Sequence, residues 1–491
     1  MKTVAEDQCV LALDQGSQSS RAIVYSASGH ALAKAQIPVT TKRYGTTCVE
    51  QNPDELVASL FAAIAGVAGQ IDPGLIVVAG LATQRSSIVC WNRVSGRALS
   101  PVLSWQDRRA EAWLEAFSDS GQRVQDITGL LLSPHYGVSK MRWCLDNNKA
   151  VQTCAANGEL VMGPLSSYLT YQLLDERPLL VDPANASRTL LFDYRAGRWS
   201  EELANLFGIS ESVLPEPVTS SYSYGMLNAS GVSASLQIVT GDQSAALFAF
   251  GELRSNTVYA NLGTGAFLQR PLGSEPVSVP GLLNSVVYSD NTRTDYVLEA
   301  TVNGAGSAVN YIAHELQLEP KWVETYLAQS LNQVADPPLF LNGVSGLGAP
   351  WWIADFRSHF FYAAEESTNL PHDAAEKMTA VIESIVFMLQ TNFELCVSAA
   401  GMPDHWVLSG GLSALNGLCQ RLADISGVPV IRPDVDEATA YGVSNLLGIG
   451  SSLPASTNNE SVFVPQTNAN LESRYLRWQD AMADFIAVEC C

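Results

Sequence analysis

Asp14, Gly16 and Ser17 lie between two apolar stretches near the start of the chain, in the segment CVLALDQGSQSSRAIVY. The apolar stretches predict two strands joined by a tight turn. Glycine lets a backbone approach a ligand closely, and turn N–H groups and hydroxyls donate hydrogen bonds to anions. Asp14 could hold Mg²⁺ through water, with Arg21 on the second strand. This is phosphate-binding chemistry, although an ordinary hairpin turn can have the same composition.

A similar pattern returns about half a chain later, in the segment TVYANLGTGAFLQ. Here Gly263, Thr264 and Gly265 separate two apolar stretches, and such a GTG also occurs in many ordinary hairpins. Two turns of this kind in one chain predict two related halves that hold one polyphosphate between them.

Asp242 follows an apolar strand and begins the segment DQSAALFAF. A carboxylate at that place can be the N-cap of a helix. It can equally be a general base that faces the space between the two halves. The residues alone leave both interpretations open.

Three further segments place polar or small residues next to predicted elements. Gly410 and Gly411 follow a strand and open a helix, where a nucleotide can lie against bare backbone, although such a pair can also be structural. Arg85 leaves the buried strand LIVVAGLAT and needs an acidic or polyhydroxyl partner, which an ion pair between domains would also supply. Segment 105–109 (WQDRR) leads into a helix and can be a charged helix start.

The elements that must position these residues alternate along the chain. Strands are expected at 9–13, 21–26, 31–38, 75–83, 87–91, 237–240, 257–262, 266–270, 294–299, 405–411 and 428–431. Helices are expected at 53–70, 107–118, 137–147, 163–174, 199–206, 302–315, 372–399, 412–426 and 437–449. This order predicts an α/β fold with a largely parallel sheet covered on both faces.

Composition narrows the class of protein. A chain of 491 residues predicts two to three domains, and 47% hydrophobic and 16% charged residues are ordinary for a globular enzyme. The net charge of −21 argues against a nucleic-acid or anionic-membrane partner. With no apolar run near 20 residues and no signal peptide, we expect a cytoplasmic protein. The nine cysteines show no CxxC spacing and predict free thiols, and a lipidation or redox role for Cys490 and Cys491 is disfavoured.

Taken together, these segments resemble the FGGY carbohydrate kinases, and within them the glycerol kinase branch, from about residue 9 to residue 448. The resemblance rests on the first phosphate segment, on GLATQRSSIVCWNRVSGRALSPVLSWQDRR, DPANASRTLLFDYRAGRWS, TGDQSAALFAFG, LGTGAFL and SGLGAPWW, and on the segment from LSGGLSALNG to DEATAYG. It implies two ribonuclease H-like (actin-like ATPase) domains with a central cleft. We place them at 1–245, on the acceptor side, and 246–491, on the nucleotide side.

The resemblance also implies roles. Asp242 resembles the catalytic base, and Asp14 the carboxylate that positions Mg²⁺. The positions that resemble ATP contacts are Gln15, Gly16, Ser17, Arg21, Gly263, Thr264, Gly306, Gly410, Gly411 and Asn416. The positions that resemble the polyol pocket are Arg85, Ser86, His135, Asp242 and Gln243.

The chain departs from the glycerol kinases in the acceptor pocket. Those enzymes have a Glu directly after the polyol-binding Arg, where this chain has Ser86, and a Tyr where it has His135. The Gln-Met-His of xylulose kinases is also absent, since residues 84–86 are Gln-Arg-Ser. Outside the pocket, Ile353 replaces an Asp, and Leu415 replaces an Asn, for which the adjacent Asn416 could substitute.

These observations predict ATP-dependent phosphorylation of a small polyol or ketose larger than glycerol, with ATP and Mg²⁺ as cofactors. A true glycerol kinase is the alternative within the family, and a non-catalytic actin-like ATP-binding sensor is the alternative outside enzymes. A homodimer is one option for the assembly.

Overall fold

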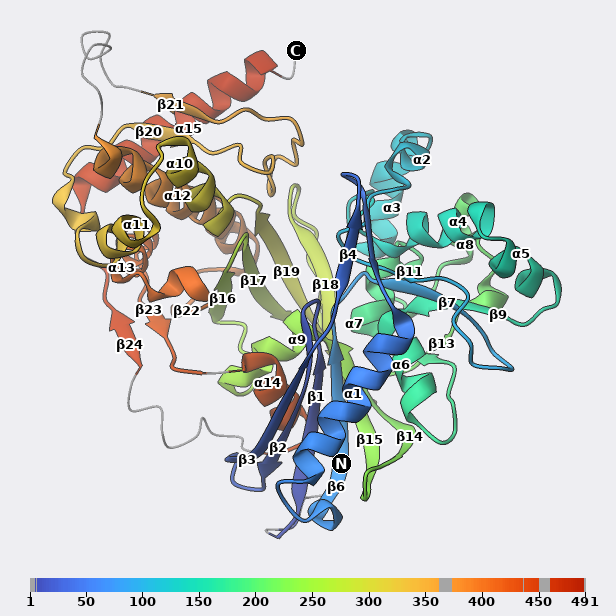
Figure 1. The fold of residues 1–491 in the computed structure, drawn as a ribbon. Coiled ribbons are helices and arrows are strands. Elements are labelled where there is room, and N and C mark those ends of the chain that lie inside the picture. Colours follow the sequence, from blue (N-terminus) through green and yellow to red (C-terminus); the bar gives the residue numbers. More distant parts are fainter. Residues whose placement is uncertain (1–4, 6, 362–372, 436, 450–459, 490–491) are drawn as a thin grey trace.

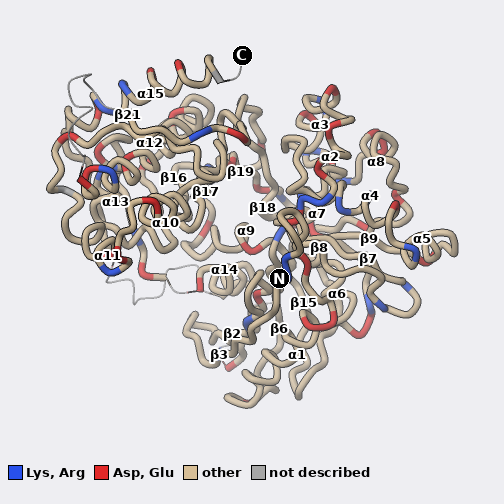
Figure 2. The backbone as a smooth tube through the Cα atoms, turned by 45° about the horizontal axis from the view of Figure 1, so that its top comes forward, with Lys and Arg blue, Asp and Glu red and all other residues tan. Residues whose placement is uncertain are grey.

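The computed structural model describes residues 5, 7–361, 373–435, 437–449 and 460–489, so Cys490 and Cys491 lie outside the described residues. The described chain forms two α/β lobes, each built around one large sheet (Figure 1). Acidic positions occur on helices of both lobes, among them α3, α8 and α15 (Figure 2). The predicted fold class is confirmed.

The sheet of the first lobe is buried on its central strands. In spatial order it consists of β14 (Ser221–Ala229), β15 (Val232–Gly241), β6 (Ile76–Thr83), β1 (Cys9–Gln15), β2 (Ser19–Ser26) and β3 (Ala31–Pro38). A smaller sheet, which the sequence predicted only in its strand at 87–91, lies beside it. Its order is β4 (Thr41–Tyr44), β5 (Cys48–Gln51), β8 (Val102–Leu103), β7 (Ile88–Asn92) and β9 (Leu160–Pro164).

The sheet of the second lobe repeats the pattern of the first. Its order is β18 (Leu283–Ser289), β19 (Thr294–Val302), β17 (Ala266–Gly273), β16 (Thr257–Leu262), β22 (His405–Ser409), β23 (Val430–Arg432) and β24 (Ser461–Phe463). Three strand pairs complete the described sheets: β10 (Leu180–Val181) with β13 (Glu216–Pro217), β11 (Phe192–Asp193) with β12 (Arg198–Trp199), and β20 (Leu339–Leu341) with β21 (His359–Phe361).

The expectation of largely parallel sheets is wrong. Only the centres are parallel, β15–β6–β1 in one lobe and β16–β22–β23 in the other. The flanking strands pair antiparallel, because short turns join β1 to β2 and β16 to β17, and a tight turn can connect only antiparallel neighbours.

Helices cover both sheets. In the first lobe they are α1 (Pro53–Ala68), α2 (Glu111–Glu115), α3 (Gly121–Thr128), α4 (Gly137–Asn147), α5 (Lys149–Ala156), α6 (Leu165–Leu173), α7 (Pro183–Ala186), α8 (Glu201–Phe207) and α9 (Asp242–Leu247). In the second half of the chain they are α10 (Gly306–Glu315), α11 (Pro320–Gln329), α12 (Ala374–Ala400), α13 (Asn416–Ser426), α14 (Ala438–Leu446) and α15 (Ala469–Glu489).

The helix expected at 107–118 is mostly absent, since only α2 forms there. Asp107 is fully buried, and its carboxylate accepts from the backbone N–H of Val49 and from the Arg109 guanidinium. These bonds hold residues 107–109 as a turn against β5, so the charged segment is a structural corner rather than a helix start.

The long helix α12 bears on the expectation that no apolar run spans a membrane. One window of 18 residues in it is apolar and long enough to cross a membrane by composition. That window is 78% buried inside the second lobe, where α12 contributes residues such as Ile385 and Phe393 to the core. It therefore reads as a core helix.

Helix α14 returns from the second half of the chain to the first sheet, beside β1 (Figure 1). Its contact with α9 is close, because a Cβ on Gly442 would collide with the backbone oxygen of Ala245. The first lobe therefore includes an element that lies beyond the predicted boundary at 245, and the boundary itself stays a prediction.

Candidate active site between the lobes

Three predicted site segments meet at one edge of the first sheet. Asp14 pairs with Ala82 in the parallel register of β1 and β6, and Thr83 pairs with Gly241 of β15. The carboxyl ends of these three neighbouring strands therefore carry Asp14, Arg85 and Asp242. Open α/β sheets bind their ligands at such an edge.

The first turn is held by charge pairs. Arg21 lies opposite Asp14 in the β1–β2 register and donates from Nη1 to Asp14 Oδ2 at 3.0 Å. Its Nε lies 3.3 Å from a carboxylate oxygen of Glu437, just before α14. Burial and the neighbouring charge of Asp242 raise the pKa of Asp14 to about 7, although Arg21 acts to lower it. Asp14 and Asp242 are thus close enough to repel one another.

Ser17, predicted to contact phosphate, is tied to the acceptor side of the site. Its hydroxyl accepts a hydrogen bond from Trp105 Nε1 at 3.0 Å and donates to Gln84 Oε1 at 3.3 Å. Gly16 closes the turn by donating its N–H to Ser19 O at 3.0 Å, and the side-chain amide of Gln84 donates to Gln15 Oε1 at 3.1 Å. Gln84 and Trp105, which lie near the acceptor positions, therefore stabilise the turn.

The predicted nucleotide positions in the second lobe meet at the ends of β16 and β22, which pair in parallel. Gly306 begins α10 and donates its N–H to Gly263 O at 2.9 Å, while Ala305 N–H donates to Thr264 O at 3.1 Å. Gly410 has φ +87°, and a Cβ on it would lie 2.7 Å from Leu262 O. Only glycine satisfies both conditions, so this junction brings a bare backbone next to the second turn.

Two predicted nucleotide positions lie farther along the chain. Gly411 is exposed directly after Gly410. Asn416 is exposed at the start of α13, and its Oδ1 accepts a hydrogen bond from Arg432 Nη1 at 2.9 Å. Leu415, which stands where the family has an Asn, packs against the core of the second lobe. An adenine contact by Asn416 would have to compete with Arg432.

Asp242 is the first residue of α9 and not its N-cap, which is Gly241. Its Oδ1 accepts from the N–H of Gln243 at 2.7 Å. Burial raises the pKa of Asp242, against the lowering charges of Arg85 and Arg188. A cavity of about 140 Å³ lies between the lobes, lined from the first by Asp242 and Gln243 and from the second by residues of β16, β17 and β22. This placement suits a base better than a helix cap.

A buried charge cluster joins the lobes beside Asp242. Arg85 donates to Glu299 Oε1 at 3.0 Å and also to Gln243. Arg188 donates to the other oxygen of Glu299 and, at 2.7 Å, to Ser285 Oγ. Burial acts to raise the pKa of Glu299, but the two arginines outweigh it and hold the pKa well below its usual range. Glu299 therefore stays ionised and fixes the Arg85 guanidinium.

Ser86 is buried, with 2% of its surface exposed, and has a left-handed backbone with φ +63°. Its Oγ has no hydrogen-bond partner among the described residues. A buried polar atom without a partner is costly and in native proteins commonly marks a place where a water or ligand binds.

His135 lies in the loop before α4. Its ring meets the Trp105 ring edge-on at 5.6 Å between centroids. Burial and the charges of Lys140, Arg188 and Arg85 lower the pKa of His135 to about 3, so the ring is neutral at pH 7. It can donate or accept one hydrogen bond without bringing a charge to the site.

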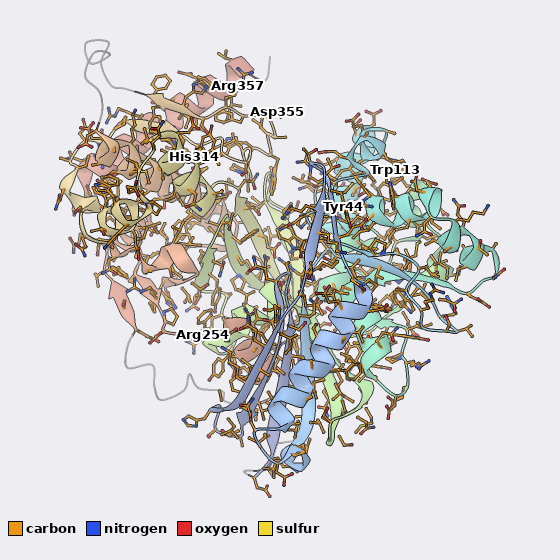
Figure 3. The ribbon with its side chains drawn as sticks, in the orientation of Figure 1. Tyr44, Trp113, Arg254, His314, Asp355 and Arg357 are labelled. Carbon is orange, nitrogen blue, oxygen red and sulfur yellow. The ribbon has the colours of Figure 1, made fainter. Side chains whose placement is uncertain are left out.

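Sequence reasoning missed Glu299 and Arg188, and it did not assign Trp105 to the site. One signal was visible: Glu299 interrupts the apolar strand segment YVLEATV, and a carboxylate in a buried strand needs a partner. Arg188 and Trp105 carried no comparable local signal. In the upper part of Figure 3, Tyr44 and Trp113 are labelled on the first lobe, and Asp355 and Arg357 on the second.

The residues present fit a magnesium ion that arrives with a nucleotide. Within the described residues no group of three or more His, Cys, Asp and Glu side chains could hold a metal by itself. Mg²⁺ is commonly bound by one or two carboxylates together with substrate phosphates. Asp14, whose ionisation is opposed by burial and by Asp242, would gain from a nearby cation.

Comparison with known families covers almost the whole chain. The N-terminal domain of the FGGY family of carbohydrate kinases matches residues 9–249, and its C-terminal domain matches residues 258–450. The glycerol kinase of Cereibacter sphaeroides is 32% identical over 497 residues, which covers 98% of this chain and 99% of that protein. The glycerol kinase of Alcanivorax borkumensis is 32% identical over 489 residues, covering 96% and 97%.

Solved structures agree on the fold. Plasmodium falciparum glycerol kinase with ADP superposes with a TM-score of 0.88 at 22% identity, covering 98% of both chains. The xylulose kinase of Rhodospirillum rubrum gives a TM-score of 0.85 at 17% identity, covering 98% and 99%. The gluconate kinase of Lactobacillus acidophilus gives 0.82 at 19%, covering 98% of both. At these identities the likeness shows the fold alone.

Proposed function

Since this chain belongs to the FGGY family of carbohydrate kinases and is therefore an ATP-dependent phosphotransferase, we propose that its acceptor is a small polyol or ketose larger than glycerol. We expect a polyol or ketose of tetrose to pentose size. The single observation that carries this proposal is the buried hydroxyl of Ser86, next to Arg85, which has no hydrogen-bond partner in the described part of the chain.

Among the described residues the buried Ser86 hydroxyl still has hydrogen-bonding capacity to satisfy. A glutamate in this position would bring a longer side chain and a charge, and serine brings neither. Satisfying the Ser86 hydroxyl with a substrate hydroxyl removes the cost of leaving it buried without a partner. The neutral ring of His135 offers a further uncharged partner. Together they suit an additional hydroxylated carbon.

In the proposed mechanism Asp242 accepts the proton of the attacking hydroxyl. Its raised pKa makes it a stronger base than an exposed aspartate, provided the pH keeps it ionised. Glu299 fixes the Arg85 guanidinium, which orients the acceptor by donating hydrogen bonds to the hydroxyls of the acceptor. ATP with Mg²⁺ supplies the phosphoryl group and offsets its charge, and Asp14 would hold the metal. Phosphoryl transfer needs this positioning more than covalent chemistry.

The nucleotide is held by the two facing turns in the proposed arrangement. The N–H groups of Gly16 and Gly263 are already bonded within their own turns, so in this arrangement the phosphate donors are the N–H and hydroxyl of Thr264 from the second lobe and the N–H of Ser17 from the first. Arg21 is already bonded to Asp14, so binding of phosphate would require it to share its donors. Gly306, Gly410 and Gly411 leave the backbone open for the rest of the nucleotide.

A true glycerol kinase is the second candidate, because the curated relatives named above are glycerol kinases with matching length. The non-catalytic sensor is not retained, since the chain belongs to a kinase family and carries both Asp14 and Asp242. The homodimer and the cytoplasmic location stay predictions.

The test is a coupled assay of ADP release with glycerol, erythritol, threitol, erythrulose, ribulose, xylulose and ribitol. We expect a four- or five-carbon compound to raise ADP release well above the background with ATP alone. If no compound raises it, the proposed acceptor class is wrong.

A further inference from the structure

Lys140, on the first turn of α4, is the one lysine among the described residues that is buried, with 1% of its surface exposed. Its Nζ donates to three consecutive backbone oxygens: Pro134 at 2.9 Å, His135 at 2.6 Å and Tyr136 at 3.1 Å. An ammonium group has three N–H donors, so all of them are used on one loop.

The partners of Lys140 are unusual for a buried cation. Buried ammonium groups are commonly paired with a carboxylate. In the described part of the chain no carboxylate lies within ion-pair distance of Lys140, and the nearby Asp107 is bonded to Arg109. Burial lowers the pKa of Lys140 to about 7, although the charge of Asp107 acts to raise it. The atoms bonded to Nζ are the three carbonyl oxygens, so what these bonds fix is the shape of the loop.

That loop faces the acceptor side of the site. The three carbonyl oxygens turn inward toward Nζ, which leaves the side chains of the same residues to point elsewhere. The His135 ring meets Trp105, whose indole N–H donates to Ser17. The Tyr136 hydroxyl interacts with Arg188, which binds Glu299. The loop thus touches both the aromatic wall and the charge cluster that holds Arg85.

We propose that Lys140 is a positioning residue for the acceptor, which sets the backbone of residues 134–136 and through it the place of the His135 ring. Lys140 itself does not reach the acceptor. The inference rests on the proposed function only in taking His135 as part of the acceptor pocket.

The test compares Lys140→Met, which keeps the length and apolar stem but has no donors, with Lys149→Met, an exposed lysine at the start of α5. Both are assayed with ATP and the best acceptor of the wild-type enzyme. We expect Lys140→Met to raise the acceptor KM about tenfold or more, the loss expected for hydrogen bonds to a charged donor, with the ATP KM within about twofold. Lys149→Met should leave both KM values unchanged.

A double-variant cycle shows whether Lys140 acts through the loop. If it does, adding His135→Ala to Lys140→Met raises the acceptor KM much less than His135→Ala does in the wild-type chain. Additive effects would overturn the proposal, as would equal changes in both KM values. Lys140→Gln, which retains two N–H donors, should lie between wild type and Lys140→Met.

Folding is monitored by thermal unfolding of each variant. If both Lys140 variants fail to fold, the proposal is overturned, because Lys140 then maintains the lobe and not the acceptor loop. If instead no acceptor is found for the wild-type enzyme, the proposed function fails first. The loop assignment is then judged from the imidazole NMR signals of His135 in the wild-type and Lys140→Met proteins, recorded with and without glycerol. The same His135 signals in both proteins under both conditions would overturn it.

Discussion

The two sides of the interlobe site are built from different parts of the chain. The nucleotide side depends on backbone, with glycines at Gly306 and Gly410 and turns closed by main-chain bonds. The acceptor side depends on side chains. Glu299 fixes the Arg85 guanidinium, and Lys140 bonds the backbone of the loop that carries His135. A side-chain pocket can change its ligand by single substitutions, whereas a backbone site cannot. The departures from the glycerol kinases at Ser86 and His135 lie on the acceptor side.

The largest expected effect is a loss of kcat on substitution of Asp242, the proposed base, which lies between the nucleotide side and the acceptor side. Asp242→Asn keeps the shape of the side chain but cannot accept the proton, so kcat should fall about 10³-fold, within the range for loss of a general base. The ATP KM should change little, and the thermal stability should not fall, because burial already opposes the charge of Asp242. The measurement is steady-state kinetics beside Asp126→Asn, an exposed aspartate of α3. Turnover retained in Asp242→Asn would remove Asp242 from the mechanism.

On the backbone side, adding one methyl group at Gly410 should disrupt ATP binding. Gly410→Ala places a Cβ 2.7 Å from Leu262 O at a left-handed φ, so the junction must shift. We expect ATP to bind at least about tenfold more weakly, with the acceptor KM nearly unchanged. Calorimetric titration with ATP measures it.

The control is Gly427→Ala, which has a similar φ of +72° at the end of α13 but open space around its Cβ. It carries the conformational cost without the clash. Equal loss of ATP affinity in both variants would show that the junction after β22 has no special role.

One substitution on the acceptor side should shift the acceptor preference toward that of the glycerol kinases. Ser86→Glu restores the carboxylate of the glycerol kinases and should lower the glycerol KM about tenfold, because a hydrogen bond to a charged group contributes about 1.5–3 kcal/mol. Ser86→Glu should also raise the KM for a larger acceptor. Ser86→Gln, of equal size without charge, separates the two causes. Unchanged acceptor preference in Ser86→Glu would contradict the role of this position.

The smallest expected effect is on thermal stability. It comes from Asp14→Asn, which removes the charge of the side chain but keeps its shape. The pKa of Asp14 is about 7 in the fold, above its ordinary value, even with Arg21 beside it. The folded state therefore binds the proton more tightly than the unfolded chain, so the stability that Asp14 contributes falls as pH rises from about 4 toward 7. Asp14→Asn should raise Tm by a few degrees at pH 8, by clearly less at pH 5 and by almost nothing near pH 4, measured without nucleotide. The opposite trend would refute this electrostatic account.

The turns and glycine junctions on the backbone side could be located from the sequence, because their signals are local, and their contacts with a nucleotide stay a prediction. Gly263 and Gly410 lie next to apolar strands, and the turn around Gly16 is readable within one segment of the chain. The order of strands and helices likewise predicts the two-lobed α/β fold. The antiparallel flanks of both sheets follow from the hairpin turns, and a stricter application of that rule would have predicted them.

The support of the acceptor side could not be predicted, because its partners are far apart in the chain. Glu299 meets Arg85 across 214 positions and Arg188 across 111. Lys140 is close in sequence to the loop it binds, but only the fold shows that its stem is buried and that its ammonium turns back on residues 134–136. Interactions of this kind appear only when the lobes are assembled.

The most direct test of the proposed acceptor is the ratio of kcat/KM values for the wild-type enzyme, measured under the same conditions for glycerol and for each four- and five-carbon compound. A larger acceptor should exceed glycerol by about tenfold or more, the factor that one well-placed hydrogen bond supplies. If glycerol has by far the highest kcat/KM, Ser86 and His135 do not enlarge the pocket, and the chain is a glycerol kinase.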